Sequence, residues 1–342
     1  MKYIKLFEQY SEISQINEGV IKLTTDEKTQ LNNLVLKIEE IIISKDFSNA
    51  NVIVKGPEGS EDKIKGINSI ELGEFKYLFA DKKPGVLKVY VSDCKSVPEN
   101  LRDGLGYAWY RPNDPKNLED GQIVINASEF SSNLENKYEE SHREKLRSIL
   151  THEIIHAKDP NFNHLKGKEE TNKDYSTRDE EIKAFTSQFI DLVENKVEKW
   201  IEINKGKMND SNKQNEVDMI GQILNNLLLI FARKIDHGSL NKNISDFIED
   251  FNLNINSLNK RFKFGTDEFE NFHKVYGSKV LISVFGRLIE LKEGEPKRYK
   301  KFINALYKSI SELFDKLNKS IEKTNHKPIK IETNLDKINF SW

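Results

Sequence analysis

The pattern of apolar and polar residues predicts one helix and then a series of strands in the first part of the chain. Between residues 26 and 45, after Thr25 as the predicted N-cap, apolar residues recur at helical intervals. Five segments rich in β-branched and aromatic residues predict strands at 51–55, 74–79, 87–92, 106–110 and 122–126. The last two flank a Pro- and Asp-rich loop at 111–121, and they can pair as an antiparallel hairpin.

The apolar spacing becomes helical after these strands. Helices are predicted at 138–158 and 179–201, and a polar stretch follows at 204–216. Beyond it, helical spacing predicts further helices near 216–235, 242–262, 266–293 and 297–322. We therefore expect an α+β domain at 26–203, a helical bundle at 217–323, and flanking segments at 1–25 and 324–342.

The sequence His152-Glu153-Ile-Ile-His156 lies within the helix predicted at 138–158. Residues four apart share one helix face, with Cβ atoms about 5–6 Å apart, so His152 and His156 can bind one metal ion. Glu153 projects to one side, where it can act as a general base on a water molecule at the metal. The alternative is a helix with two solvated or packed histidines and an incidental glutamate.

The surroundings of this motif favour a metal site. An apolar stripe on the side away from the histidines would bury the back of the helix and leave its polar front facing a cleft or another element: Leu146, Leu150, Ile154 and Ala157. Pro160 ends the helix soon after the motif, because a proline pushes the preceding residue out of the α region.

A catalytic zinc ion usually takes three protein ligands, so a third ligand is required. The metzincin pattern HExxHxxGxxH is excluded, because its glycine and third histidine fall on Asp159 and Phe162. Glu181 is the candidate, since it shares a mostly apolar helix face with Phe185, and burying an unpaired acid costs free energy. Its rival is Glu180, about 100° away around the helix, which we expect to face water.

These motifs resemble those of the zincins, and within them the gluzincin-like metallopeptidases, whose third ligand is a glutamate on a downstream helix. Glu181-Ile-Lys-Ala184 matches the Glu-x-x-Ala pattern of several such families. The stretch from Tyr175 through Arg178 to Phe185 resembles anthrax-lethal-factor-type peptidase domains. The resemblance implies a small twisted sheet, an active-site helix and a ligand helix.

The same resemblance implies roles for individual residues. One zinc ion per chain would be held by the two histidines and Glu181. Tyr175 would donate a hydrogen bond to the developing oxyanion, with His164 and Arg178 as further candidates; the alternative for Tyr175 is an amphipathic tyrosine at a loop–helix junction. Thermolysin-like enzymes carry an aspartate where this chain has Phe185, so Asp159 becomes the candidate partner that orients a ligating histidine.

We therefore expect a zinc-dependent endopeptidase acting on protein or peptide substrates. The substrate is expected to add as an extended strand to an exposed sheet edge, formed by 106–110 or by 122–126. The alternative is a non-catalytic zincin-fold module, such as a phage virion component or a toxin-like binding protein. Glu153 argues against this alternative, because a purely structural metal site needs no base.

Composition and charge narrow the function classes further. The net charge of −2 gives no reason to expect a nucleic-acid partner, and the single cysteine, Cys94, excludes an internal disulfide and a Cys-rich zinc site. The longest apolar run, 227–232, is far shorter than the about 20 residues that cross a bilayer. The N-terminus has no apolar core of a signal peptide, so we expect a cytoplasmic protein or one packaged in a phage virion.

Residues 1–18 have two interpretations. The sequence Ile16-Asn17-Glu18 resembles the Ile/Leu-x-Glu site at which a prohead protease removes the leader peptides of tailed-phage head proteins. The mature chain would then begin at Gly19. The alternative is an ordinary flexible terminus or a helix packed on the domain.

Overall fold

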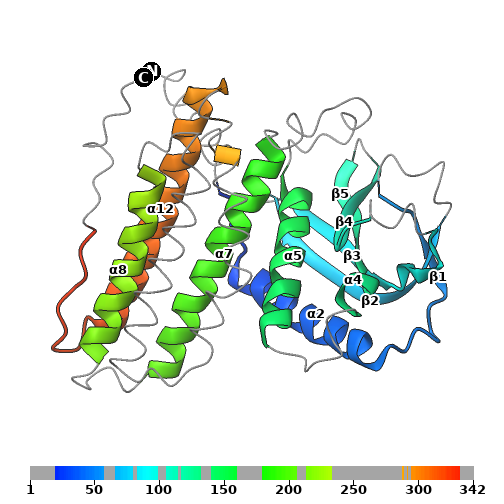
Figure 1. Ribbon diagram of the computed structural model, residues 1–342, viewed down its shortest axis with the longest axis horizontal. Helices are drawn as coiled ribbons and strands as arrows, with labels where there is room; N and C mark the ends of the chain where they lie inside the picture. Colours follow the sequence, from blue (N-terminus) through cyan, green and yellow to red (C-terminus); the bar gives the residue numbers. More distant parts are fainter. Residues whose placement is uncertain are drawn as a thin grey trace. The chain divides into compact units, whose positions relative to one another are not determined.

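The computed structural model describes residues 20–57, 66–79, 83–98, 105–114, 117–131, 140–159, 179–205, 213–232, 287–288, 291 and 294–331 (Figure 1). The chain forms two compact units, of which the first includes residues 21–188 and the second continues from Phe189. The predicted helix at 242–262 and most of the one at 266–293 lie outside the described residues.

The first unit contains a five-stranded sheet and confirms the expected α+β class. Its strands are β1 (Val52–Val54), β2 (Ile67–Leu78), β3 (Pro84–Ser92), β4 (Ala108–Asp114) and β5 (Asn117–Asn126). They are arranged in the order β1-β2-β3-β5-β4. Only the β3–β5 pair is parallel, and the other neighbours are antiparallel.

The predicted β4–β5 hairpin is present, but the loop predicted at 111–121 is wrong. Both strands continue through most of this range, and Asp114 pairs with Asn117. Pro112 suggested a loop because it has no N–H for a sheet ladder. A proline is nevertheless accepted in an edge strand where its nitrogen faces away from the neighbouring strand.

Strand β4 is the open edge beside β5. The Asn126 amide donates to the Tyr107 carbonyl at 2.9 Å, and in an antiparallel pair the inward-facing backbone groups alternate along the strand. Ala108, Tyr110 and Pro112 therefore direct their backbone groups outward, and no strand of the described residues pairs with this side. Of the two predicted substrate edges, only 106–110 belongs to an edge strand, because β5 lies between β3 and β4.

Helices α2 (Thr25–Ser44) and α5 (Glu140–Lys158) cover one face of the sheet. Helix α2 packs on β2 and on α5, and α5 packs on β4 and β5. Large, fully buried side chains come from both helices and from β2, β3 and β5: Leu31, Ile38, Phe75, Leu87, Ile123, Ile125, Leu146, Leu150 and Ile154. A separate apolar cluster lies around Tyr90, Trp109 and Val124, which alternate with these strand residues and so point to the other face.

The N-cap of α2 is Thr24, and the prediction of Thr25 is corrected. The Thr24 hydroxyl accepts from the Glu27 amide at 3.2 Å, and the Glu27 carboxylate accepts from the Thr24 amide at 2.8 Å. This reciprocal capping box requires a Glu three residues after the cap, which Glu27 supplies only for Thr24.

Glu27 also connects the start of α2 to the end of α5. It is buried and accepts from the Lys158 ammonium at 2.6 and 2.7 Å and from the Leu78 amide at 3.0 Å. A buried ion pair of this kind fixes the relative position of its elements, because separating it would leave an uncompensated buried charge.

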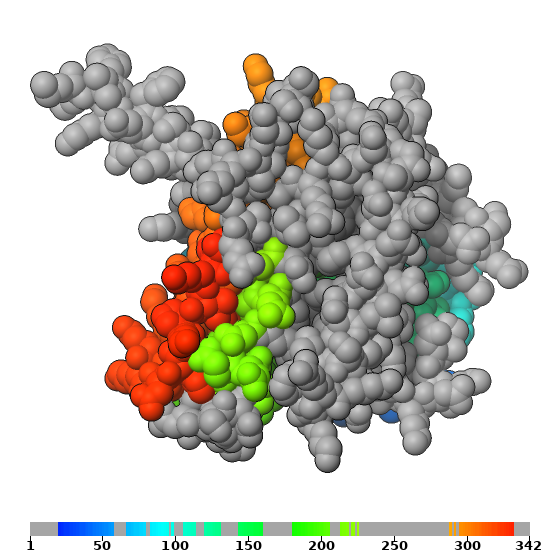
Figure 2. All heavy atoms as spheres, turned by 60° about the vertical axis from the view of Figure 1, so that its left-hand side comes forward, coloured from blue at the N-terminus to red at the C-terminus, as the bar shows by residue number. Residues whose placement is uncertain are grey.

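The second unit is helical throughout its described part. Helix α7 (Asp179–Asn204) begins in the first unit and continues into the second, which also contains α8 (Lys213–Ala232) and α12 (Pro296–Ile321). Helices α8 and α12 lie side by side (Figures 1 and 2). The helices predicted at 216–235 and 297–322 are confirmed, whereas the bundle as a whole stays a prediction.

Side chains connect the helices of this unit to one another. The Lys316 ammonium bonds to Glu194 and, at 2.7 Å, to Glu198, and the Trp200 indole donates to Glu216 at 3.0 Å. Residues after α12 return along α8, where Asn225 donates to the Lys330 carbonyl at 3.1 Å. None of the described helices has the length and apolar character needed to cross a membrane.

Candidate metal centre

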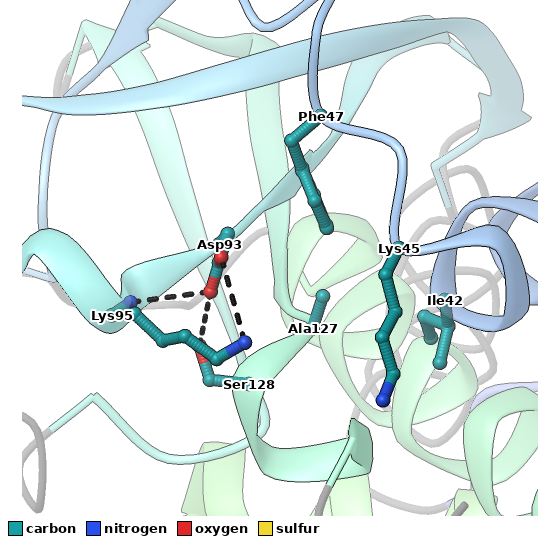
Figure 3. A pocket seen from close by; sticks show the side chains of 7 residues that line it. All are labelled: Ile42, Lys45, Phe47, Asp93, Lys95, Ala127 and Ser128. Atoms are coloured by element: carbon teal, nitrogen blue, oxygen red, sulfur yellow. Dashed lines mark hydrogen bonds and ion pairs between the residues drawn. The ribbon is translucent and has the colours of Figure 1, made fainter.

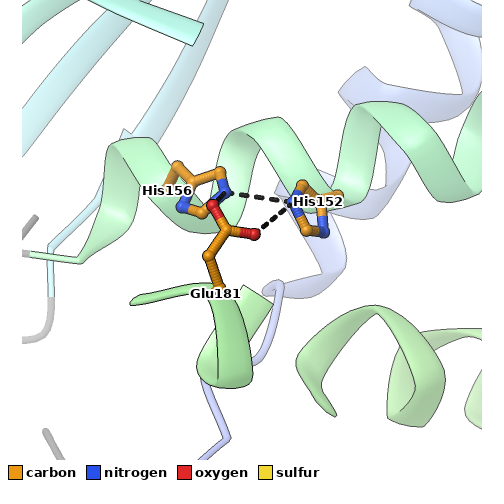
Figure 4. Close-up of side chains that lie close together, drawn as sticks. All are labelled: His152, His156 and Glu181. Carbon is orange, nitrogen blue, oxygen red and sulfur yellow. Dashed lines mark hydrogen bonds and ion pairs between the residues drawn. The ribbon is translucent and has the colours of Figure 1, made fainter. Parts of the chain in front are cut away.

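Helix α5 presents His152 and His156 on the side opposite its apolar stripe. The predicted apolar stripe is confirmed, because Leu146, Leu150, Ile154 and Ala157 are all buried. This packing fixes the rotation of α5 about its own axis. It directs His152 and His156 toward the first turn of α7 (Figure 4).

Two histidines and one glutamate converge at this point. The Nε2 atoms of His152 and His156 are 3.0 Å apart. The Glu181 carboxylate lies 3.6 Å from the His152 Nε2 and 3.4 Å from the His156 Nε2. One ligand atom from each residue lies within 4.8 Å of the others, so the three form a candidate metal-binding triad.

The two glutamates at the start of α7 have different surroundings. Glu181 is 4% exposed and lies in the triad, whereas Glu180 is partly exposed and does not belong to it. The neighbours Ile182 and Ala184 are buried as well, as expected for a helix start that packs on the protein interior. The geometry agrees with the predicted choice of Glu181 over Glu180.

Phe185 packs against one of the two histidines. Its ring centre is 4.4 Å from that of His152, and the ring planes meet at 62°. An apolar edge-to-face contact therefore restrains the His152 ring here.

Glu153 lies beside the triad and against the open sheet edge. Its carboxylate accepts a hydrogen bond from the backbone N–H of Tyr110, one of the groups that β4 directs outward. Burial raises the pKa of Glu153 to about 7, and repulsion from Glu181 adds to this, whereas His152 and the Tyr110 N–H lower it. A carboxylate with a pKa near neutrality can take up and release a proton at neutral pH.

Asp159 forms a buried ion pair with Lys183, a contact that no sequence pattern predicts. The Lys183 ammonium lies 3.0 and 3.3 Å from its two carboxylate oxygens, and both residues are buried. Lys183 is two residues from Glu181, and Asp159 is three residues from His156. The predicted role of Asp159 as the partner that orients a ligating histidine stays a prediction.

A second link joins α5 and α7 on the other side of the triad. The Gln188 side-chain amide donates to the Ser148 hydroxyl at 2.9 Å, and this pair is buried. Polar contacts from α7 therefore reach α5 both before and after its two histidines. Tyr175, His164 and Arg178 lie outside the described residues, so their proposed roles stay predictions.

A pocket elsewhere in the first unit lies between the end of α2 and the ends of β3 and β5 (Figure 3). Asp93 accepts from the Lys95 amide at 3.3 Å and from the Ser128 hydroxyl at 3.0 Å, and it lies 3.9 Å from the Lys95 ammonium. Its acidic group is therefore satisfied by its neighbours. None of the triad residues lines this pocket.

Comparison with known proteins adds no relationship to this geometry. No family model, no curated protein and no solved structure matches the chain.

Proposed function

We propose that the protein is a zinc-dependent endopeptidase of the zincin type, with His152, His156 and Glu181 as the zinc ligands. The observation that carries the proposal is the convergence of these three side chains next to Glu153 and an open sheet edge. A metal site that only stabilised the fold would need neither a base nor an edge beside it.

The donor set suits zinc. A tetrahedral zinc ion with ligand bonds of about 2.0–2.1 Å holds its ligand atoms about 3.3 Å apart. The separations of 3.0, 3.4 and 3.6 Å among the His and Glu181 atoms lie close to this value. Two imidazoles and one carboxylate also leave a fourth position for a water molecule or substrate, as in catalytic zinc sites.

Glu153 is the proposed general base. A bound zinc ion would supply the Lewis acid that activates water and polarises the peptide carbonyl. The Glu153 carboxylate would accept a proton from the attacking water and then deliver it to the leaving amine. Its hydrogen bond from the Tyr110 N–H would keep the carboxylate at the edge of β4 during both transfers.

The open edge of β4 is the proposed binding site for the peptide. The backbone groups of Ala108 and the carbonyl of Tyr110 face outward there, whereas the Tyr110 N–H already donates to Glu153, and α5 packs alongside this strand. An extended peptide that pairs with β4 would pass next to Glu153, so main-chain hydrogen bonds would bring a peptide bond to the metal. The predicted oxyanion donor Tyr175, with His164 and Arg178, belongs to the same proposal.

The experiment combines metal analysis with hydrolysis of a broad peptide library. We expect about one zinc ion per chain, and cleavage that Glu153→Gln reduces by a factor of 10² or more. Zinc content and the circular dichroism spectrum of this variant should match those of the wild type, because Glu153 is not a ligand. The proposal is wrong if reconstituted protein holds no zinc, or if Glu153→Gln retains activity within a few fold.

A further inference from the structure

A lysine lies on the same face of α5 as the two histidines, two turns before them. Lys145 and His152 are seven residues apart, which places them within about 20° around the helix and about 10 Å apart along it. The Lys145 ammonium lies 3.7 Å from the centre of the Tyr107 ring and 5.5 Å from that of Phe130. The two rings pack edge to face, with their centres 5.5 Å apart. Aromatic rings therefore hold this cation in place.

The Lys145 charge has no acidic partner in the part of the chain that the structure describes. Lys145 is partly exposed, and Tyr107 beneath it is 38% exposed. A cation held over a ring retains N–H groups that can donate to another acceptor. The Lys145 ammonium can therefore bind a carboxylate of another molecule.

Two contacts show how Lys145 lies relative to the open edge. The Lys145 ammonium lies over the ring of Tyr107, which directly precedes β4, and the Glu153 carboxylate accepts from the N–H of Tyr110 within β4. Lys145 and Glu153 are eight residues apart, about 12 Å along the helix. Tyr107 and Tyr110 are three residues apart, about 10 Å along the strand. Helix α5 and strand β4 therefore run side by side in the same direction. A chain extended along β4 would pass Glu153 at one point and Lys145 about three residues away.

We propose that Lys145 binds an acidic side chain of the peptide substrate, about three residues from the bond that is cleaved. This inference rests on the proposed function and adds a substrate preference to it. Opposite charge attracts the acid, and the aromatic support reduces the conformational freedom that the lysine must lose on binding.

The test compares peptides that carry Asp, Asn or Lys at one position, up to four residues on either side of the cleaved bond, and are otherwise identical. We expect a three- to fivefold higher kcat/KM for Asp at one position about three residues away, which is the size of a partly exposed ion pair. In Lys145→Met the Asp-to-Asn ratio should fall to about one, and in Lys145→Glu a lysine should be preferred there. The control Lys37→Met removes the same charge from exposed α2, and it should keep the wild-type ratio.

A binding measurement separates this inference from the proposed function. Fluorescence anisotropy with zinc-loaded Glu153→Gln, alone or combined with Lys145→Met, reports peptide affinity without turnover. Cleavage without an Asp preference, or a preference unchanged in Lys145→Met, would overturn the role of Lys145 and leave the peptidase intact. If acidic peptides bind in a Lys145-dependent way but the wild type does not cleave them, the binding role of Lys145 is supported and the proposed peptidase function is wrong. If neither cleavage nor Asp-selective binding occurs, both are wrong.

Discussion

Glu180 and Glu181 are adjacent in the sequence but lie in different surroundings. The Glu181 carboxylate is buried within 3.6 Å of both histidines, whereas Glu180 is partly exposed. We expect Glu181→Ala to lower zinc affinity by at least tenfold and Glu180→Ala to change it by less than twofold. Competition with a chromophoric zinc chelator measures both. Equal losses in the two variants would contradict the assignment of Glu181.

Residue patterns predicted the triad but not its supporting contacts. His152 and His156 are recognisable because four-residue spacing has a fixed geometry on a helix, and Glu181 because an acid on an apolar face needs a partner. Lys183 carries no comparable signal, since a lysine on a helix usually reaches water. Its burial depends on Asp159, which is 24 residues earlier in the chain. Only the three-dimensional packing brings the two together.

At the scale of elements, the Asp159–Lys183 pair joins the helix that carries the histidines to the helix that carries Glu181. Removing one partner of a buried ion pair costs about 3–5 kcal/mol, whereas replacing both with apolar residues is often neutral. We therefore expect Lys183→Met to lower the free energy of unfolding by about 3 kcal/mol. The double variant Asp159→Leu/Lys183→Met should recover most of this loss.

Zinc affinity would separate the positional role of this pair from its effect on stability. We expect the double variant to bind zinc about tenfold more weakly than the wild type, because apolar contacts do not fix the helices in one position. Urea unfolding and chelator competition measure the two quantities. A double variant with wild-type zinc affinity would show that the pair does not position the ligands.

The start of α2 allows a matched comparison of two neighbouring threonines. Thr24 caps the helix through its hydroxyl, whereas Thr25 is the first helical residue. We expect Thr24→Ala to lower the free energy of unfolding by about 1 kcal/mol, as for other N-caps. Thr25→Ala should change it by less than 0.5 kcal/mol, as a surface substitution does. Urea unfolding of both variants checks this, and equal losses would contradict the cap assignment.

The pattern of apolar residues located the elements better than it located their ends. Each of the five strands overlaps its predicted segment, because alternating and β-branched residues mark strands directly. The extension of β4 through Pro112 could not be predicted, since it depends on which side of the strand lacks a neighbour. The sheet order also follows from long-range pairing, such as that of β3 with β5, which no local pattern encodes.

At the scale of the whole molecule, the candidate metal site lies entirely within the first unit. A ligand stabilises the part of a protein that binds it, by about 2.7 kcal/mol when its free concentration is 100 times Kd. We therefore expect zinc to slow amide hydrogen exchange in α5 and in the first turns of α7. Exchange in α12, within the second unit, should change much less.

Hydrogen exchange with and without a chelator, read by mass spectrometry, tests this expectation. Glu181→Ala serves as the control and should show no zinc-dependent protection. Equal protection of α5 and α12 would indicate that zinc stabilises both units together, contrary to the expectation.

The open edge of β4 also affects how the protein behaves at high concentration. A sheet edge with unpaired backbone groups can join the same edge of another copy, and such pairing leads to aggregation. Pro112 interrupts this edge because it has no N–H, and Glu153 accepts from the N–H of Tyr110 two residues earlier. A second copy would therefore find an incomplete ladder of donors. Pro112 and the Tyr110–Glu153 hydrogen bond therefore limit edge-to-edge aggregation, and for the same reason a peptide would form only a few hydrogen bonds with β4 and could leave after cleavage.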